Sequence, residues 1–125
     1  AVASTAVPAQ AVVDAGSKAL GREPMRGVNG EGFGALMGHA DVLVSAMSEE
    51  HGILDLSRTD WRPRVGDTVR IVPNHVCIVV HLNDALYAVD GDRVTGVWPV
   101  AARGRMAPFT NEQASAVAPS SEILL

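Results

Sequence analysis

DVLVSAMSEE, at residues 41–50, carries the clearest strand signal in this sequence. Residues 42–47 form a mostly apolar run, and the polar residues 48–50 end it, which is typical of a buried strand. Shorter apolar pieces flank this run at residues 11–14 and 53–56. Several short apolar segments separated by polar turns predict a mainly β fold class.

A second set of apolar positions lies further along the chain. Residues 67–72 alternate polar and apolar side chains, so we expect a strand with Val69 and Ile71 on one face. Pro73 should end that strand, because proline has no N–H to donate to a ladder. Residues 76–82 are also apolar, but the run is too short to distinguish a strand from a helix.

Turn residues separate these segments. Asp90-Gly91-Asp92 lies between apolar runs at residues 86–89 and 93–97, and this pattern predicts a β-hairpin. Residues 16–25 are polar and rich in turn formers, so we expect them to be irregular. The dense glycines of residues 27–38 predict a long loop or a hairpin with bulges.

Length and composition fit one small domain. The chain has 125 residues, of which 47% are hydrophobic and 19% charged, so most of it can bury a core. We expect a β domain at residues 1–105 and an irregular or short-helical tail at residues 106–125, which are rich in Ala, Ser and Pro. The net charge of −4 argues against nucleic acid as a partner. No apolar run approaches the roughly 20 residues that span a bilayer, so we expect no membrane.

The cysteine and lysine counts are informative. Cys77 is the only cysteine, which excludes an internal disulfide and is typical of a reducing, cytoplasmic compartment. No charged segment precedes an apolar stretch at the start, so we interpret no signal peptide there. Nine of the ten basic residues are arginine, and Lys18 is the only lysine.

The best candidates for functional side chains lie in the stretch Pro73-Asn74-His75-Val76-Cys77. In extended backbone, His75 and Cys77 would point to the same side and could bind one metal ion. Zinc accepts both imidazole nitrogen and thiolate sulfur. Two protein ligands would leave open positions for water or substrate, as at a Lewis-acid site. From spacing alone two alternatives stay open: a buried free cysteine beside a turn histidine, and a Cys77 nucleophile with His75, His51 or His81 as its base.

Ser48-Glu49-Glu50-His51-Gly52 is a second dense group of functional side chains. Carboxylates beside a histidine could carry out acid–base chemistry or orient a ligand of a metal. The alternative is a solvated turn between two strands.

Read in order, several motifs of this chain resemble one family, the D-threonine aldolases and metal-dependent D-serine dehydratases. The likeness covers about residues 1–105 and lies in the C-terminal β domain of those enzymes. The motifs that carry it are Val13-Asp14-Ala15-Gly16-Ser17-Lys18-Ala19-Leu20, Ser48-Glu49-Glu50-His51-Gly52, Val65-Gly66-Asp67-Thr68-Val69, Pro73-Asn74-His75-Val76-Cys77, Val97-Trp98-Pro99-Val100 and Ala102-Arg103-Gly104-Arg105.

The resemblance implies a fold and a metal site. Enzymes of this family use pyridoxal phosphate (PLP) and have the alanine-racemase-like fold, so it implies a barrel- or sandwich-like β domain. It implies that His75 and Cys77 bind a divalent metal beside the cofactor. Aldolase-type members often have aspartate at the second position and favour manganese, so Cys77 favours zinc and the dehydratase-like pattern. Glu50 and His51 match a family motif, and they are candidates for orienting the metal ligands.

The resemblance also implies what this chain does not contain. The PLP-binding (β/α)8 barrel and its Schiff-base lysine precede the β domain in such enzymes, and Lys18 matches a different, non-catalytic family position. We therefore expect a domain of a homodimeric lyase that acts on D-β-hydroxy amino acids, inactive alone. Dehydration of D-serine and retro-aldol cleavage of D-threonine both remain open. The alternatives are a non-catalytic β module for dimerisation or ligand binding, and the β domain of a racemase.

Overall fold

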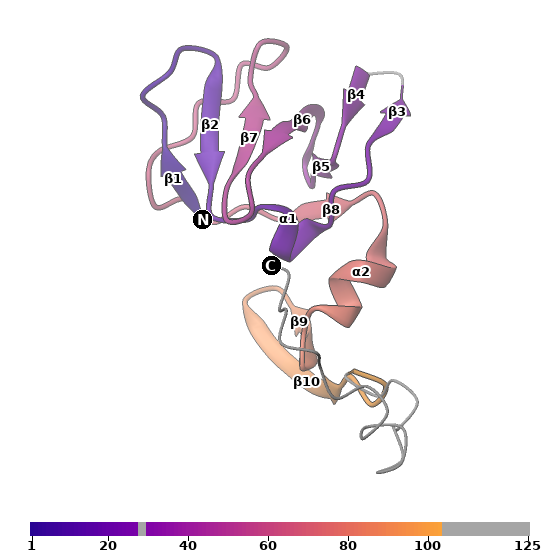
Figure 1. Ribbon diagram of the computed structural model, residues 1–125. Helices are drawn as coiled ribbons and strands as arrows, with labels where there is room; N and C mark the ends of the chain where they lie inside the picture. Colours follow the sequence, from indigo (N-terminus) through magenta and orange to yellow (C-terminus); the bar gives the residue numbers. More distant parts are fainter. Residues whose placement is uncertain (28–29, 104–125) are drawn as a thin grey trace, which may run out of the picture.

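The computed structural model describes residues 1–27 and 30–103, and this part of the chain is mainly β (Figure 1), as predicted. Arg105 and the predicted tail at residues 106–125 lie outside the described residues. The elements are β1 (Val2–Ser4), β2 (Gln10–Val13), α1 (Ser17–Leu20), β3 (Met25–Gly27), β4 (Gly30–Gly32), β5 (Gly34–Leu36), β6 (His39–Met47), β7 (Gly52–Asp55), β8 (Ile71–Pro73), α2 (Val76–His81), β9 (Ala85–Asp90) and β10 (Arg93–Pro99).

Six of these strands form one antiparallel sheet in the order β1-β2-β7-β6-β5-β8. The predicted strand at residues 42–47 is the C-terminal part of β6, which lies inside this sheet. Leu54 of β7 pairs with Ala11 of β2 on one side and with Val44 of β6 on the other. Residues paired across antiparallel strands share a face, and all three are buried. The largest fully buried side chains are those of Val2, Val13, Val42, Val44 and Leu54.

The sheet does not close into a barrel within the described residues, because β1 and β8 remain its edges. An irregular segment joins those edges instead. Val2 donates a backbone hydrogen bond to Asp67 (2.8 Å) and accepts one from Gly66 (2.8 Å). At the other end of the segment, the N–H of Met37 donates to Arg70 (2.8 Å). The barrel form of the fold prediction is therefore corrected to an open sheet.

The strand predicted at residues 67–72 is wrong over most of its length. Only its end forms a strand, β8, and Pro73 is the last residue of it. The physical reason is that Asp67 bonds to Val2 in β1 whereas Arg70 bonds to Met37 just after β5, so the backbone between them passes from one strand to another and follows no single ladder. The alternating side chains of this segment reflect partial burial of Val69 and Ile71 against the core.

The described residues contain two short helices. One forms where irregular structure was expected, and the other decides between the strand and the helix that the sequence left open. Residues 17–20, expected to be irregular, form α1, which buries Leu20. Residues 76–82, for which strand and helix stayed open, contain α2. None of the described helices is both long and apolar enough to cross a membrane. The glycine-rich stretch forms the β3–β4 hairpin and β5, in agreement with the predicted hairpin.

The predicted hairpin around Asp90-Gly91-Asp92 is confirmed as β9–β10, which projects away from the six-stranded sheet (Figure 1). Gly91 has a positive φ of 59° at the turn, where glycine is favoured. The Nη2 of Arg70 donates to the carbonyl oxygen of Gly91 at 2.6 Å and so ties the turn to the sheet edge. On one face, Tyr87 pairs with Val97, and both side chains are more than half exposed.

Candidate metal site

His75 and Cys77 lie at the junction between β8 and α2. His75 has extended backbone (φ −140°, ψ 115°) directly before the helix, and Cys77 is in the first helical turn. The expectation that extended backbone would align the two side chains is wrong, because Cys77 is helical. The side chains nevertheless lie close enough for Cys77 to help raise the pKa of His75. The cysteine is exposed, which contradicts the alternative of a buried thiol.

Glu23 completes this group from the loop after α1. Its Oε2 contacts the Nδ1 of His75, and the two side chains are 58% and 43% exposed. The hydrogen bond with Glu23, and after it the nearby Cys77 side chain, raises the pKa of His75 above its ordinary value. Sequence reasoning missed Glu23, because 52 positions separate it from His75 and no local pattern links them.

Asn74 holds the loop that carries Glu23. Its Nδ2 donates to the backbone oxygen of Glu23 at 2.9 Å and to that of Gly32, in β4, at 2.7 Å. One side-chain amide therefore connects three segments: the loop after α1, the β3–β4 hairpin and the start of α2. The position of Asn74 beside His75 in the sequence makes it part of the same local structure.

The donor set of His75 and Cys77 fits an open zinc site. Imidazole nitrogen and thiolate sulfur are both zinc ligands, and the two residues lie two positions apart at the start of α2. Among residues 1–27 and 30–103, no group of three or more His, Cys, Asp or Glu side chains is arranged to hold a metal. The pair alone therefore leaves coordination positions for water, substrate or groups outside the described residues.

Glu50 and His51 lie in the turn between β6 and β7. The carboxylate of Glu50 accepts a hydrogen bond from the ammonium group of Lys18, which lowers the pKa of Glu50 and raises that of Lys18. The N–H of His51 donates to the hydroxyl of Ser48 at 3.1 Å, which stabilises the turn. These contacts give Glu50 a structural partner. A role for Glu50 or His51 in orienting metal ligands stays a prediction.

Two of the sequence motifs pack against each other at this turn. The N–H groups of Ser17 and Lys18 donate to the carbonyl oxygens of Ser48 (2.9 Å) and Glu49 (3.1 Å). A Cβ on Gly16 would lie 2.5 Å from the backbone of Glu49, so only glycine allows this approach. Lys18 thus has a structural role in joining α1 to the sheet.

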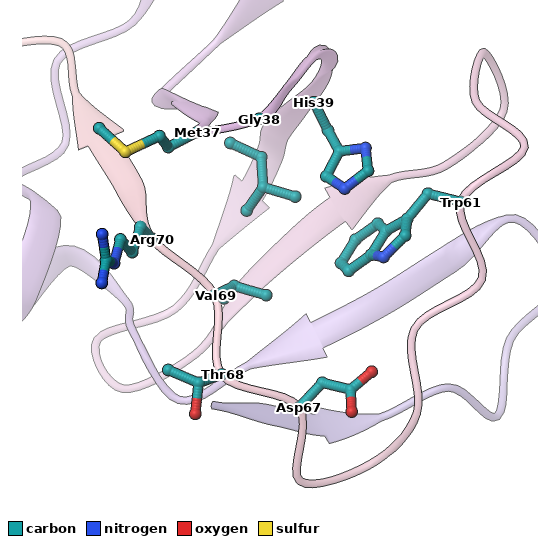
Figure 2. A pocket seen from close by; sticks show the side chains of 9 residues that line it. Met37, Gly38, His39, Trp61, Asp67, Thr68, Val69 and Arg70 are labelled. Atoms are coloured by element: carbon teal, nitrogen blue, oxygen red, sulfur yellow. The ribbon is translucent and has the colours of Figure 1, made fainter. Parts of the chain in front are cut away.

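A separate cavity of about 470 Å³ is lined by the turn between β5 and β6, by Trp61 and by residues 67–70, and Figure 2 shows it from close by. The rings of His39 and Trp61 stack there with centroids 4.7 Å apart. Asp67 and Arg70 contribute polar groups to the rim. None of the candidate site residues predicted from the sequence lines this cavity.

Comparison with known proteins identifies the family. Residues 1–89 match the family model described as "Putative serine dehydratase domain". The chain belongs to the D-threonine aldolase and D-serine dehydratase family. This result confirms the family resemblance drawn from the motifs.

Three similar proteins show how this domain occurs. An uncharacterized protein of Mycobacterium tuberculosis is 39% identical over 94 residues, which cover 75% of this chain and 69% of that protein. The 3-hydroxy-D-aspartate aldolase of Paracoccus denitrificans is 36% identical over 104 residues, which cover 83% of this chain but 24% of the aldolase. The crystal structure of D-threonine aldolase from Filomicrobium marinum matches with a TM-score of 0.66 and 33% identity, over 82% of this chain and 26% of that one. The chain thus spans about a quarter of the length of these aldolases.

Proposed function

We propose that this chain is the metal-binding β domain of a PLP-dependent lyase that acts on D-β-hydroxy amino acids. The observation that carries the proposal is the placement of His75 and the exposed Cys77 together at the junction of β8 and α2, in a family that includes aldolases. Zinc is the metal that this nitrogen and sulfur pair favours, and manganese is the alternative.

His75 and Cys77 would hold the metal on the surface of the domain, where both side chains are accessible. When bound, the metal would supply Lewis acidity toward the hydroxyl group of the substrate, and PLP would supply the electron sink. The task of the two residues is to bind and orient the ion, with thiolate charge favouring a divalent cation. Because dehydration and retro-aldol cleavage both act on a β-hydroxy amino acid, this pair is compatible with either reaction.

The choice between the two reactions is open to direct test. The aldolase names of similar proteins favour retro-aldol cleavage. The cysteine at position 77 instead favours the dehydratase-like pattern implied by the family resemblance. PLP would lie in a barrel outside this chain, with its own Schiff-base lysine, and we propose that the assembled enzyme is a cytoplasmic homodimer.

A non-catalytic β module is the second candidate, and a specific observation favours it. In the M. tuberculosis relative, 94 matched residues are 69% of the whole protein, which leaves room for only about 40 more. A (β/α)8 barrel needs roughly 250 residues. A short member of the family therefore cannot contain the barrel itself, and either binds a separate one or has another role.

Metal content tests the proposal on the 125-residue chain. We expect the purified chain to bind zinc with one-to-one stoichiometry, and we expect His75→Ala and Cys77→Ala to lose it. His81→Ala is the matched control, because His81 is an exposed histidine at the end of α2 that is outside the proposed site. Unchanged zinc binding in both site variants would refute the site.

A product assay tests the reaction. The polypeptide that carries this domain together with its barrel is incubated with PLP and D-threonine or D-serine, with and without a chelator. Glycine and an aldehyde identify retro-aldol cleavage, and a keto acid with ammonia identifies dehydration. Activity on neither substrate, in a preparation that binds zinc, would favour the non-catalytic module.

A further inference from the structure

Glu23 contacts one particular nitrogen of His75. The contact is made at Nδ1, which leaves Nε2 as the second ring nitrogen. A neutral imidazole has one N–H donor and one lone pair, so an N–H at Nδ1 that donates to a carboxylate places the lone pair on Nε2. Carboxylates that accept a hydrogen bond from a metal-binding histidine fix its ring orientation and raise its basicity in many metal sites.

The loop that carries Glu23 is itself held in place at two points. The Nδ2 of Asn74 donates to the backbone oxygen of Glu23, as described above. Gly21 ends α1 with a positive φ of 72°, and a Cβ on it would lie 2.5 Å from a methyl group of Ile78 in α2. The loop therefore packs closely on the helix that carries Cys77, and Glu23 reaches His75 from a fixed backbone.

We propose that Glu23, held by Asn74, is a positioning residue that keeps the Nδ1 of His75 engaged and presents Nε2, together with the Cys77 sulfur, to a divalent metal. This inference rests on the proposed function. It assigns a role to two residues that bind no metal themselves. It also explains why a side chain outside the predicted motifs contacts the candidate ligand.

Zinc affinity of the full chain tests this role, measured by competition with a chromophoric chelator. Glu23→Ala should weaken zinc binding about 10- to 100-fold. Glu23→Gln should recover part of the loss, because its amide oxygen still accepts the hydrogen bond from Nδ1. Asn74→Ala should weaken binding less than Glu23→Ala does. Asp90→Asn is the carboxylate-to-amide control, since Asp90 is an exposed acidic residue in the β9–β10 hairpin, and it should bind zinc as the parent chain does.

A readout without metal separates positioning from general stability. The metal-free chain is measured at a pH high enough for histidine to be neutral. Under these conditions ¹⁵N NMR shows which ring nitrogen of His75 carries the proton. We expect the proton on Nδ1 in the parent chain, loss of that preference in Glu23→Ala and its partial return in Glu23→Gln. Circular dichroism of each variant confirms that the sheet is intact.

The outcomes are distinguishable. If the parent chain binds zinc and His75→Ala loses it, while the Glu23 variants bind normally with an unchanged tautomer, this inference is wrong and the proposed function stands. If Glu23→Ala loses zinc as completely as His75→Ala, and Glu23→Gln recovers none of the loss, Glu23 is itself a metal ligand. The proposed positioning role is then wrong as well. If the parent chain binds no zinc at all, the proposed function fails first, and the inference fails with it.

Discussion

Lys18 has a structural role in this chain. Its ammonium group contacts the carboxylate of Glu50, and its backbone N–H bonds to Glu49, so it joins α1 to the turn between β6 and β7. The sequence motif around Lys18 indicated that it is not the Schiff-base residue, and these contacts explain what else a lysine does there. Both side chains are more than 60% exposed, so the ion pair is solvated and contributes modestly to stability.

The pH dependence of this pair can be predicted with its sign. The hydrogen bond from Lys18 lowers the pKa of Glu50, so the folded chain holds this proton less tightly than the unfolded chain. The stabilisation is present above the ordinary glutamate pKa of about 4.3 and is lost as the pH falls through the lowered folded value. A carboxyl ¹³C NMR titration should therefore give Glu50 a midpoint below the ordinary value.

Substitution at Lys18 provides the control for that titration. In Lys18→Met the Glu50 midpoint should rise toward the ordinary value, because the donor and the positive charge are both removed. Lys18→Arg keeps a cation and should keep most of the shift. An identical Glu50 midpoint in the parent chain and Lys18→Met would contradict the ion pair.

At the scale of elements, sequence patterns predicted those strands whose neighbours in the sheet are close in sequence. β6 was predicted from its apolar run, and the β9–β10 hairpin from the turn residues between its strands, because a hairpin depends on local chemistry. The segment at residues 67–70 was mispredicted because its conformation depends on hydrogen bonds to Val2 and Met37, which only the tertiary structure brings near it. The sequence could not decide whether the α2 region is a strand or a helix, because an apolar run of that length is compatible with both.

The β9–β10 hairpin depends on contacts outside itself. A two-stranded hairpin alone is marginally stable in water, and Tyr87, Val89 and Trp98 are each more than half exposed. The hydrogen bond from Arg70 to Gly91, with Asp92 3.9 Å from the same guanidinium nitrogen, connects the turn to the sheet edge. Arg70 should therefore contribute to the stability of this element more than to that of the sheet.

Hydrogen exchange measures that contribution. In Arg70→Ala we expect the amides of β9 and β10 to lose about 2- to 12-fold in protection, the range that corresponds to one net hydrogen bond. The amides of β2 and β7 should keep their protection. Arg93→Ala is a matched control, because Arg93 is an exposed arginine at the start of β10 that pairs with Asp90 inside the hairpin. Equal loss of protection in both parts of the chain would show that the hairpin and the sheet open together.

At the scale of the whole molecule, the candidate site was predictable only in part. His75 and Cys77 are two positions apart, so the motif itself brought them together, although through a strand–helix junction and not through a strand. Glu23 joins them only because the chain turns at Gly21 and packs on α2, which no spacing in the sequence reveals. The proposed metal-ligating pair is thus local in sequence, whereas the placement of Glu23, which we propose orients it, depends on the tertiary fold.

The distribution of buried residues divides the described molecule into a packed sheet and a thinly packed remainder. All nine buried apolar residues precede residue 57, while α2, β9 and β10 contain none.

Leu54 is fully buried between β2 and β6, so Leu54→Ala should lower the free energy of unfolding by about 2–5 kcal/mol. Leu82→Ala, the same change at a 40% exposed position after α2, should cost less than about 1 kcal/mol. Urea denaturation followed by circular dichroism measures both, and equal losses would mean that α2 shares the core of the sheet.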